Sequence, residues 1–182
     1  MLFDLCNSPT TFKRLMEKIL QPVPASACVV YLDDILVHKF TYAVVLTNLR
    51  TVFQLIAKAN LHLNPAKCSL FRQHTSFLGH LVSERGVSTD PAKVEVVEKW
   101  SAPTSTGEVR SFLGLASYYQ RFIAVFANIA RPLHQLTEKG QRFTWSPASQ
   151  NAFSQLRKAL ITAPILAIPD PTKSFLLDVT LA

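Results

Sequence analysis

Apolar residues spaced three or four positions apart predict two amphipathic helices in the first third of the chain. The first begins at Ser8-Pro9, with serine as N-cap and proline in the first turn, and ends before Pro22. The second covers about residues 41–59. The residues predicted to face inward are Phe12, Leu15, Met16, Ile19 and Leu20 in the first helix and Leu46, Leu49, Phe53 and Ile56 in the second.

Between these helices, two short apolar runs flank a pair of aspartates. Residues 27–30 and 35–37 are β-prone and too short for helices, so they predict a buried β-hairpin with Asp33 and Asp34 at its tip. Burying or half-burying two adjacent carboxylates is costly, and a divalent cation such as Mg²⁺ would compensate for that cost. An Asp-Asp pair is also common in ordinary turns, so the dipeptide alone leaves both interpretations open.

The next part of the chain predicts small antiparallel strands. They are expected around residues 61–63, 68–71 and 76–82, with Glu84-Arg85-Gly86 as a turn. A helix, a hairpin, a second helix and small strands in this order indicate an α+β fold.

From Asp90-Pro91, another N-cap and proline pair, the pattern becomes mainly helical. A long helix is predicted from about 106 to 126, and Ser146-Pro147 begins a further helix, followed by strands at 165–166 and 175–177. The core stripe of the long helix contains Val109, Phe112, Leu113, Ala116, Phe122, Ile123 and Phe126, and that of the last helix contains Phe153, Leu156 and Leu160.

Tyr118, Tyr119 and Arg121 extend the aromatic surface of the long helix beyond its core stripe. Such exposure is unusual for a free helix. Tyrosines beside an arginine suit contacts with the backbone and sugars of a nucleic acid. Packing in the core is the alternative for each aromatic residue.

The charge balance favours a polyanionic partner. Nineteen Lys and Arg residues against twelve Asp and Glu residues give a net charge of +7. Basic residues also solubilise ordinary surfaces, so charge alone leaves nucleic-acid binding open. A hydrophobic fraction of 48% argues against a disordered chain.

The cysteines indicate a reducing compartment. Cys6, Cys28 and Cys68 show neither a disulfide framework nor the spacing of a zinc site, and Cys28 and Cys68 are expected to be core thiols. The sequence contains no secretion signal and no uncharged run long enough to span a membrane. We therefore expect an intracellular protein, cytoplasmic or nuclear, without a membrane partner.

Tyr31-Leu32-Asp33-Asp34 resembles the Tyr-x-Asp-Asp motif of reverse transcriptases, and further segments resemble that family in the same order. They resemble the polyproteins of gypsy-type LTR retrotransposons in particular. The resemblance implies a partial polymerase palm over 1–83, a helical thumb over 84–135 and the truncated start of a ribonuclease H-like domain over 136–182. The resembling segments are residues 3–12, 61–68, 77–80, 110–122, 143–145, 152–156 and 164–170.

The resemblance implies RNA-directed DNA synthesis from dNTPs on an RNA or DNA template–primer, with Mg²⁺ or Mn²⁺ as cofactor. Asp33 would be a direct metal ligand and Asp34 a weaker one, and Lys67 would lie near the pyrophosphate leaving group. Phe3 and Tyr31 would lie beside the incoming nucleotide. By spacing alone, Lys67 is better explained as a solvated lysine after a proline turn.

A further set of residues would contact the primer or the duplex. Gly79 would allow close approach of the backbone, whereas without the resemblance it marks a β-bulge. The set consists of Phe77, Leu78, Gly79, His80, Arg110, Tyr118, Tyr119 and Arg121.

Three departures from the family pattern bear on activity. The third metal-binding carboxylate of the family would precede Phe3, Asp4 stands where the family has glycine, and Thr180 stands where ribonuclease H has a metal-binding aspartate. We therefore expect weak metal binding, no ribonuclease H activity and no polymerisation by this chain alone, with an N-terminal polymerase segment as a candidate partner. A basic nucleic-acid-binding or interaction module and a decayed transposon remnant are the alternatives.

Overall fold

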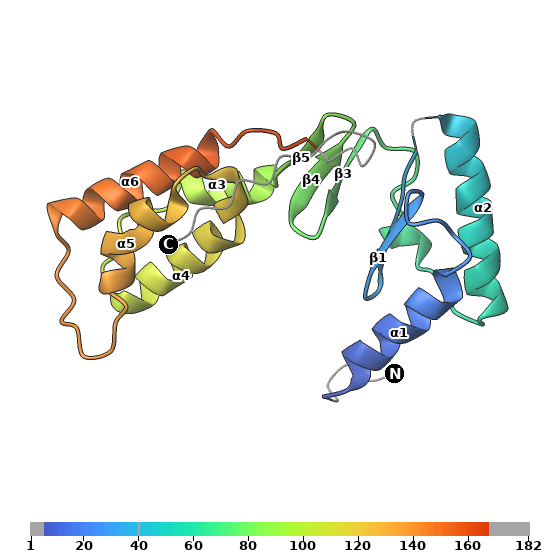
Figure 1. The fold of residues 1–182 in the computed structure, drawn as a ribbon, viewed down its shortest axis with the longest axis horizontal. Coiled ribbons are helices and arrows are strands. Elements are labelled where there is room, and N and C mark those ends of the chain that lie inside the picture. Colours follow the sequence, from blue (N-terminus) through green and yellow to red (C-terminus); the bar gives the residue numbers. More distant parts are fainter. Residues whose placement is uncertain (1–5, 40, 168–182) are drawn as a thin grey trace, which may run out of the picture. The chain divides into compact units, whose positions relative to one another are not determined.

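The computed structural model describes residues 6–39 and 41–167, and the chain divides into two compact units, Met1–Phe77 and Leu78–Ala182. Helices and short strands are mixed along the chain, as the predicted α+β class requires (Figure 1). The elements of the first unit are α1 (Ser8–Leu20), β1 (Cys28–Tyr31), β2 (Asp34–Val37), α2 (Tyr42–Lys58), a short 3-10 helix η1 (Pro65–Lys67) and β3 (His74–Phe77).

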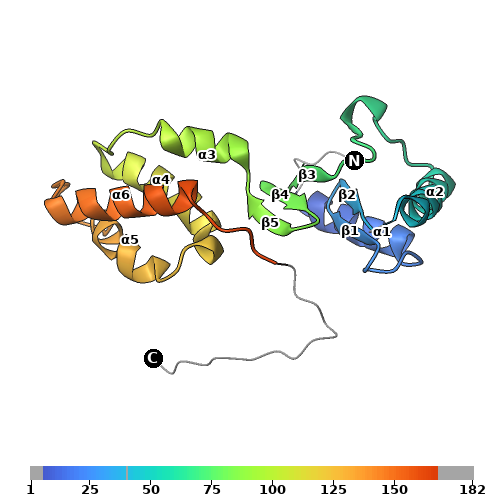
Figure 2. The same ribbon diagram turned by 90° about the horizontal axis from the view of Figure 1, so that it is seen from above.

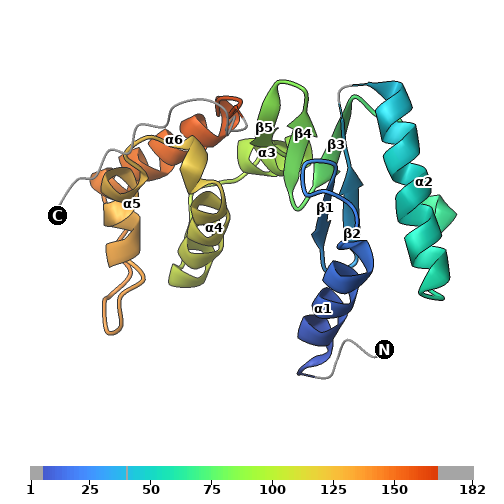
Figure 3. The same ribbon diagram turned by 45° about the vertical axis from the view of Figure 1, so that its right-hand side comes forward.

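The predicted hairpin is confirmed in the first unit. β1 and β2 are antiparallel, with Cys28 opposite Val37 and Tyr31 opposite Asp34. The two helices α1 and α2 pack beside this hairpin (Figure 3). Apolar side chains from all four elements and from the α1–β1 connection bury one another, which is the main source of stability of the unit. The buried cluster contains Met16, Leu20, Val23, Ala27, Cys28, Val52 and Ile56.

Several details of the first unit differ from the sequence prediction. Ser8 is the first residue of α1 and is buried, while Asn7 is the N-cap. Phe53 is 39% exposed and Val52 is buried in its place. Val52 and Ile56 are four positions apart and share one helix face, whereas Phe53 is rotated away by about 100°. Leu15 is exposed as well.

The strands predicted at 61–63 and 68–71 are also wrong. The backbone there is irregular except for η1, in which the Asn64 side chain accepts a hydrogen bond from the Ala66 amide at 3.0 Å. Pro65 lacks an amide donor, so it suits the first position of such a turn better than a strand. Cys68 is exposed rather than a core thiol, although Cys28 is buried as expected.

The second unit combines a hairpin with a helical bundle. Its helices α3, α4, α5 and α6 lie side by side (Figure 2). The elements are β4 (His80–Ser83), β5 (Gly86–Thr89), α3 (Pro91–Glu98), α4 (Thr106–Tyr118), a 3-10 turn η2 (Gln120–Phe122), α5 (Phe126–Gln135) and α6 (Pro147–Ile161). The most deeply buried side chains include Val97, Val109, Phe112, Ala116, Leu133, Phe153, Leu156 and Leu160.

Two predicted helix starts are confirmed by their caps. The Asp90 side chain accepts a hydrogen bond from the Ala92 amide at 3.0 Å, and Ser146 Oγ accepts one from the Ser149 amide at 3.1 Å. The single helix predicted from 106 to 126 is wrong. α4 ends at Tyr118, η2 follows, and Val125 adopts a left-handed conformation with φ of 53° before α5 begins.

The strand predicted at 165–166 is a single antiparallel bridge between Leu166 and Val87. Val87 and Leu166 each donate an amide hydrogen bond to the other's carbonyl at 2.8 Å. Gly86, with φ of 128°, allows this approach, because a Cβ there would lie 2.2 Å from the Leu166 carbonyl oxygen. The strand predicted at 175–177 lies outside the described residues.

α6 falls in the region predicted to begin a ribonuclease H-like domain, and it shares its buried cluster with α4 and α5. The three-part division at 83/84 and 135/136 stays a prediction. Among the residues that the structure describes, none of the helices is both long and apolar enough to span a bilayer.

Candidate functional sites

The tip of the first hairpin carries the two predicted metal ligands. Leu32 and Asp33 form the two-residue turn, and Asp34 is the first residue of β2. Leu32 has φ of 52°, a left-handed conformation that L-residues seldom adopt. Asp33 and Asp34 are both exposed. The expectation that the fold buries or half-buries this pair is therefore wrong, because both carboxylates lie at the tip of the hairpin, where no other described element covers them.

The donor chemistry of this tip fits a hard cation. Carboxylate oxygens are the ligands that Mg²⁺ accepts, usually from one or two side chains together with water and substrate phosphates. Within residues 6–39 and 41–167, however, no cluster of three or more His, Cys, Asp or Glu side chains could hold a metal ion. The hairpin therefore offers Asp33 and Asp34 as one edge of a metal site.

The other residues predicted near the nucleotide are spread over the first unit. Tyr31 is exposed at the end of β1, and Lys67 is exposed at the end of η1. Phe77, which was predicted to contact the primer, is half-buried at the end of β3. Phe3 and Asp4 lie outside the described residues, as does Thr180.

The second unit brings five of the predicted residues together around the turn that precedes β4. Leu78 and Gly79 form this turn, with φ of 49° and 67°, so Gly79 lies in a tight turn and not in a β-bulge. The Tyr118 hydroxyl donates a hydrogen bond to the Leu78 carbonyl. The Tyr119 hydroxyl donates one to the Gly79 carbonyl at 2.5 Å.

His80 packs among the aromatic rings of this cluster. Its ring stacks on Tyr118 with centroids 5.2 Å apart, and it meets Tyr119 edge-on at 5.5 Å and Phe122 at 5.7 Å. Burial lowers the pKa of His80, and Arg121 lowers it further, while Asp90 acts in the opposite direction. The imidazole is therefore held in its neutral form.

Tyr119 differs from the sequence prediction. Its side chain is only 2% exposed, whereas Tyr118 is 48% exposed. Burial raises the pKa of the Tyr119 phenol, which keeps its hydroxyl protonated and able to donate. Tyr119 is thus part of the core and cannot lie on an exposed aromatic surface.

The outer face of α4 carries a glycine between an arginine and a tyrosine. Gly114 is exposed, and a Cβ placed there would meet nothing within 4 Å. Arg110 and Tyr118 lie four residues to either side of it on the same face, and Arg121 follows in η2. Arg110 Nη2 donates a hydrogen bond to the Thr137 carbonyl at 3.1 Å, and Arg121 is exposed.

Sequence reasoning missed Gly114, Asp90 and Phe122 as neighbours or parts of this site. The four-residue spacing from Arg110 through Gly114 to Tyr118 was visible in the sequence and could have indicated a shared helix face. The hydroxyl contacts of the tyrosines had no such signal, because the carbonyls that accept them lie 40 residues away.

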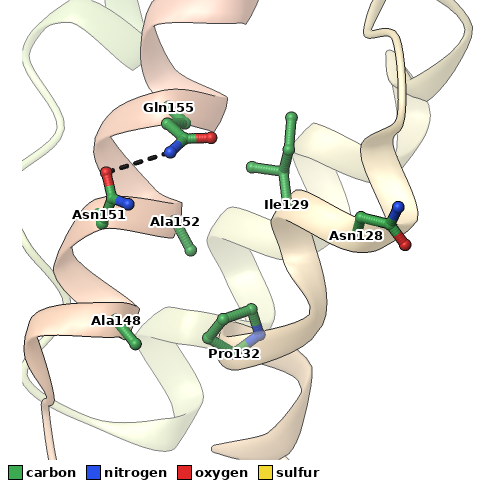
Figure 4. Close-up of a pocket in the computed structure, with 7 residues that line it drawn as sticks. All are labelled: Asn128, Ile129, Pro132, Ala148, Asn151, Ala152 and Gln155. Atoms are coloured by element: carbon green, nitrogen blue, oxygen red, sulfur yellow. Dashed lines mark hydrogen bonds between the residues drawn. The ribbon is translucent and has the colours of Figure 1, made fainter.

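A shallow groove between α5 and α6 is separate from both sites (Figure 4). Amide side chains lie around it, and the Gln155 amide donates a hydrogen bond to Asn151 Oδ1 at 3.1 Å. None of the residues predicted for function lines the groove. Its lining consists of Asn128, Ile129, Pro132, Ala148, Asn151, Ala152 and Gln155.

A hairpin with two aspartates at its tip, followed by a glycine turn and a helical bundle, matches a known class of proteins. Residues 4–82 match the family described as reverse transcriptase (RNA-dependent DNA polymerase). Residues 4–82 are therefore similar to reverse transcriptases, and the relatives described next are Pol polyproteins of retrotransposons.

Relatives match nearly the whole chain. It is 38% identical over 178 residues to the retrovirus-related Pol polyprotein from transposon 297 of Drosophila melanogaster, covering 97% of this chain and 17% of that protein. It is 36% identical to the polyprotein from transposon opus of the same species, covering 95% and 18%. The Tf2-3 polyprotein of Schizosaccharomyces pombe is 30% identical, covering 98% and 13%. The chain thus spans less than a fifth of these relatives.

Solved structures confirm the fold class. The foamy viral protease-reverse transcriptase in complex with RNA/DNA hybrid matches with a TM-score of 0.83 and 25% identity, covering 92% of this chain and 23% of that chain. The dRH form of the same protein in complex with double-stranded DNA matches with a TM-score of 0.82 and 26% identity, covering 90% and 29%.

Proposed function

We propose that this chain takes part in RNA-directed DNA synthesis. Its second unit binds the template–primer duplex, and the first unit supplies Asp33 and Asp34 to the nucleotidyl-transfer site. The observation that carries the proposal is the outer face of α4, where an exposed glycine lies between an arginine and a tyrosine. The nucleic acids bound by the foamy viral enzymes support the same partner class.

Gly114 lowers the stability of α4, and this is explained if a ligand binds at that position. A glycine inside a helix is less favourable than alanine by about 1 kcal/mol. Packing within the unit does not require it, because a Cβ there meets open space. A missing side chain on an exposed face does allow close approach of a ligand backbone. Arg110, four residues before Gly114 on the same face, and exposed Arg121 in η2 suit a ligand with phosphates.

The Leu78–Gly79 turn is suited to the primer terminus. The C=O and N–H of one trans peptide point in opposite directions. The hydrogen bond from Tyr118 to the Leu78 carbonyl therefore directs the Gly79 amide away from Tyr118. A backbone amide at a tight turn is a suitable donor to a phosphate oxygen. We assign primer contacts to Phe77, Leu78, Gly79 and His80.

Asp33 and Asp34 would hold Mg²⁺ or Mn²⁺ together with carboxylates from outside the described residues. A bound cation of this kind offsets the negative charge on the triphosphate of a dNTP. Tyr31 and Phe3 would lie against the nucleotide. Lys67 would place a cation near the leaving pyrophosphate, and its exposed position on η1 leaves its ammonium group accessible.

The binding step is tested by fluorescence polarisation with a labelled RNA/DNA hybrid at increasing salt. Each phosphate neutralised by a basic side chain releases counterions, so the logarithm of affinity should fall linearly with the logarithm of salt concentration. Arg121→Gln should reduce the magnitude of that slope by about 1. Arg50→Gln, an exposed arginine on α2, is the matched control and should leave the slope unchanged. Binding that is absent at low salt, or indifferent to salt, would remove the support for this function.

A nucleic-acid-binding module without catalysis is the second candidate function. It is favoured by the exposed hairpin tip, which within the described residues provides two adjacent carboxylates and no third acidic partner. Binding with no extension of a primer, even when a complementary polymerase segment is supplied, would favour this candidate.

A further inference from the structure

We propose that Tyr118 and Tyr119 are positioning residues for the primer terminus, acting through the Leu78–Gly79 turn and not through contact with nucleic acid by their hydroxyls. Their two hydroxyls, here called the tyrosine clamp, hold the two carbonyls of that turn. The inference rests on the proposed function, in which the turn meets the primer. It assigns a different role to both tyrosines from the one that the sequence predicts.

The clamp is built from neighbouring residues at the end of one helix. Tyr118 is the last residue of α4, and Tyr119 is its C-cap with φ of −98° and ψ of 13°. Their rings lie nearly perpendicular, at 87°, with centroids 5.0 Å apart. Two adjacent hydroxyls can therefore reach two adjacent carbonyls, those of Leu78 and Gly79.

The Leu78–Gly79 turn has a backbone conformation that needs stabilising contacts. Leu78 and Gly79 both have positive φ, and for a leucine that conformation is strained. Hydrogen bonds to both carbonyls favour this conformation over alternatives that would turn the carbonyls away. Gly79 also packs against the clamp, since a Cβ there would lie 3.4 Å from the Tyr118 ring.

The next residue is held by the same rings. His80 stacks on Tyr118 and meets Tyr119 edge-on. Tyr119 is anchored in turn, because it is buried and its ring lies 6.0 Å from that of Phe122. The carbonyls of Leu78 and Gly79 and the ring of His80 are therefore all contacted by residues at the C-terminal end of α4.

The hydroxyls can be separated from the rings by experiment. Replacing both tyrosines with phenylalanine keeps the stacking on His80 and the packing in the core, but it removes both donors. Two carbonyls then lose their partners, and the turn is free to change its conformation. The variant pair is Tyr118→Phe with Tyr119→Phe in the full 182-residue chain. Tyr42→Phe is the matched control, because Tyr42 is 65% exposed on α2 in the other unit.

The first readout is amide hydrogen exchange followed by mass spectrometry. In the double variant, peptides covering residues 78–83 should exchange at least tenfold faster than in the wild type. Peptides within α4 should be unchanged, because Val109, Phe112 and Ala116 remain buried. Unchanged exchange at the turn overturns the clamp, whatever the chain binds.

The second readout compares two RNA/DNA hybrids with equal numbers of phosphates, one with a recessed 3′ end and one blunt. The wild type should prefer the recessed end, and the double variant should lose that preference while its affinity for the blunt hybrid changes less than twofold. An equal loss of affinity for both hybrids would mean that the hydroxyls contact the duplex directly, and it would overturn the proposal. If the wild type binds neither hybrid, the proposed function fails, and the primer-positioning role of the tyrosines fails with it. The exchange readout then decides by itself whether the tyrosine hydroxyls hold the turn.

Discussion

His80 lies among three aromatic rings, and one positive and one negative side chain act on its imidazole. Tyr118, Tyr119 and Phe122 surround the ring, Arg121 disfavours a second positive charge, and Asp90 favours one. Burial is the largest of these effects and, with Arg121, it lowers the pKa of His80 below its ordinary value of about 6.5. The neutral imidazole is therefore favoured in this cluster.

This pKa shift predicts how stability depends on acid. The unfolded chain binds the proton more readily than the folded one, so the contribution of His80 is fully present above about pH 6.5 and is lost as the pH falls through its lowered folded pKa. Urea unfolding at pH 7.5 and pH 5.0 should show a smaller acid-induced loss of unfolding free energy in His80→Phe than in the wild type. Exposed His62→Phe serves as the control. Equal losses of unfolding free energy in all three proteins would contradict the contribution assigned to His80.

At the same scale, the sequence predicts some roles and not others. The hairpin that carries Asp33 and Asp34 was predictable, because short apolar runs on both sides define it locally, while the metal-binding role of the two aspartates stays a prediction. The burial of Tyr119 was not predictable, because it depends on where α4 ends and on a turn 40 residues earlier. The exposure of Cys68 follows likewise from an irregular segment that apolar composition alone had indicated as a strand.

Among the elements, α4 has two different faces. One face carries Val109, Phe112 and Ala116 into the core, and the other presents Gly114 to solvent. A helix that only needed to be stable would not keep glycine there. Gly114 therefore lowers the stability of the helix but leaves the outer face open to a ligand.

Gly114→Leu should move stability and binding in opposite directions. Leucine is the better helix former, so the unfolding free energy should rise by about 0.5–1 kcal/mol. Its side chain should obstruct the duplex and weaken hybrid binding about tenfold, equivalent to ~1.4 kcal/mol. Denaturant unfolding and polarisation measure the two effects. The control is Ala57→Leu, which adds an apolar side chain to an exposed position of α2. Unchanged affinity in Gly114→Leu would show that this face does not approach the nucleic acid.

The end of α4 at Tyr118 could not be predicted from the pattern of apolar residues. Phe122 and Ile123 are buried, so the apolar stripe continues past the end of the helix. No glycine or proline marks the change, since the left-handed residue before α5 is Val125. By contrast, the starts of α3 and α6 were predicted correctly because Asp90 and Ser146 cap them by local hydrogen bonds.

In the molecule as a whole, the two compact units carry different parts of the proposed chemistry. The first unit has its own core around Met16, Val52 and Ile56 and presents the aspartate pair. The second has a separate core and holds the turn, the tyrosine clamp and the outer face of α4. The predicted palm over 1–83 would have grouped the Leu78–Gly79 turn with the aspartate pair, whereas in the structure this turn belongs to the same compact unit as α4.

Among the described residues, the exposed aspartate pair supplies only part of the metal site that the proposed chemistry needs. Two adjacent carboxylates on one hairpin can line only one side of a two-metal site, and working sites place their groups to within about 0.5 Å. We therefore expect catalysis to require carboxylates in addition to Asp33 and Asp34.

Primer extension on a homopolymer RNA template tests this most directly, with Mg²⁺ and then Mn²⁺. The chain alone should not extend the primer above background. Extension should appear when a separate polymerase segment carrying a further carboxylate is added, and it should vanish when the chain carries Asp33→Asn. Extension by the chain alone that is abolished by Asp33→Asn would contradict the account.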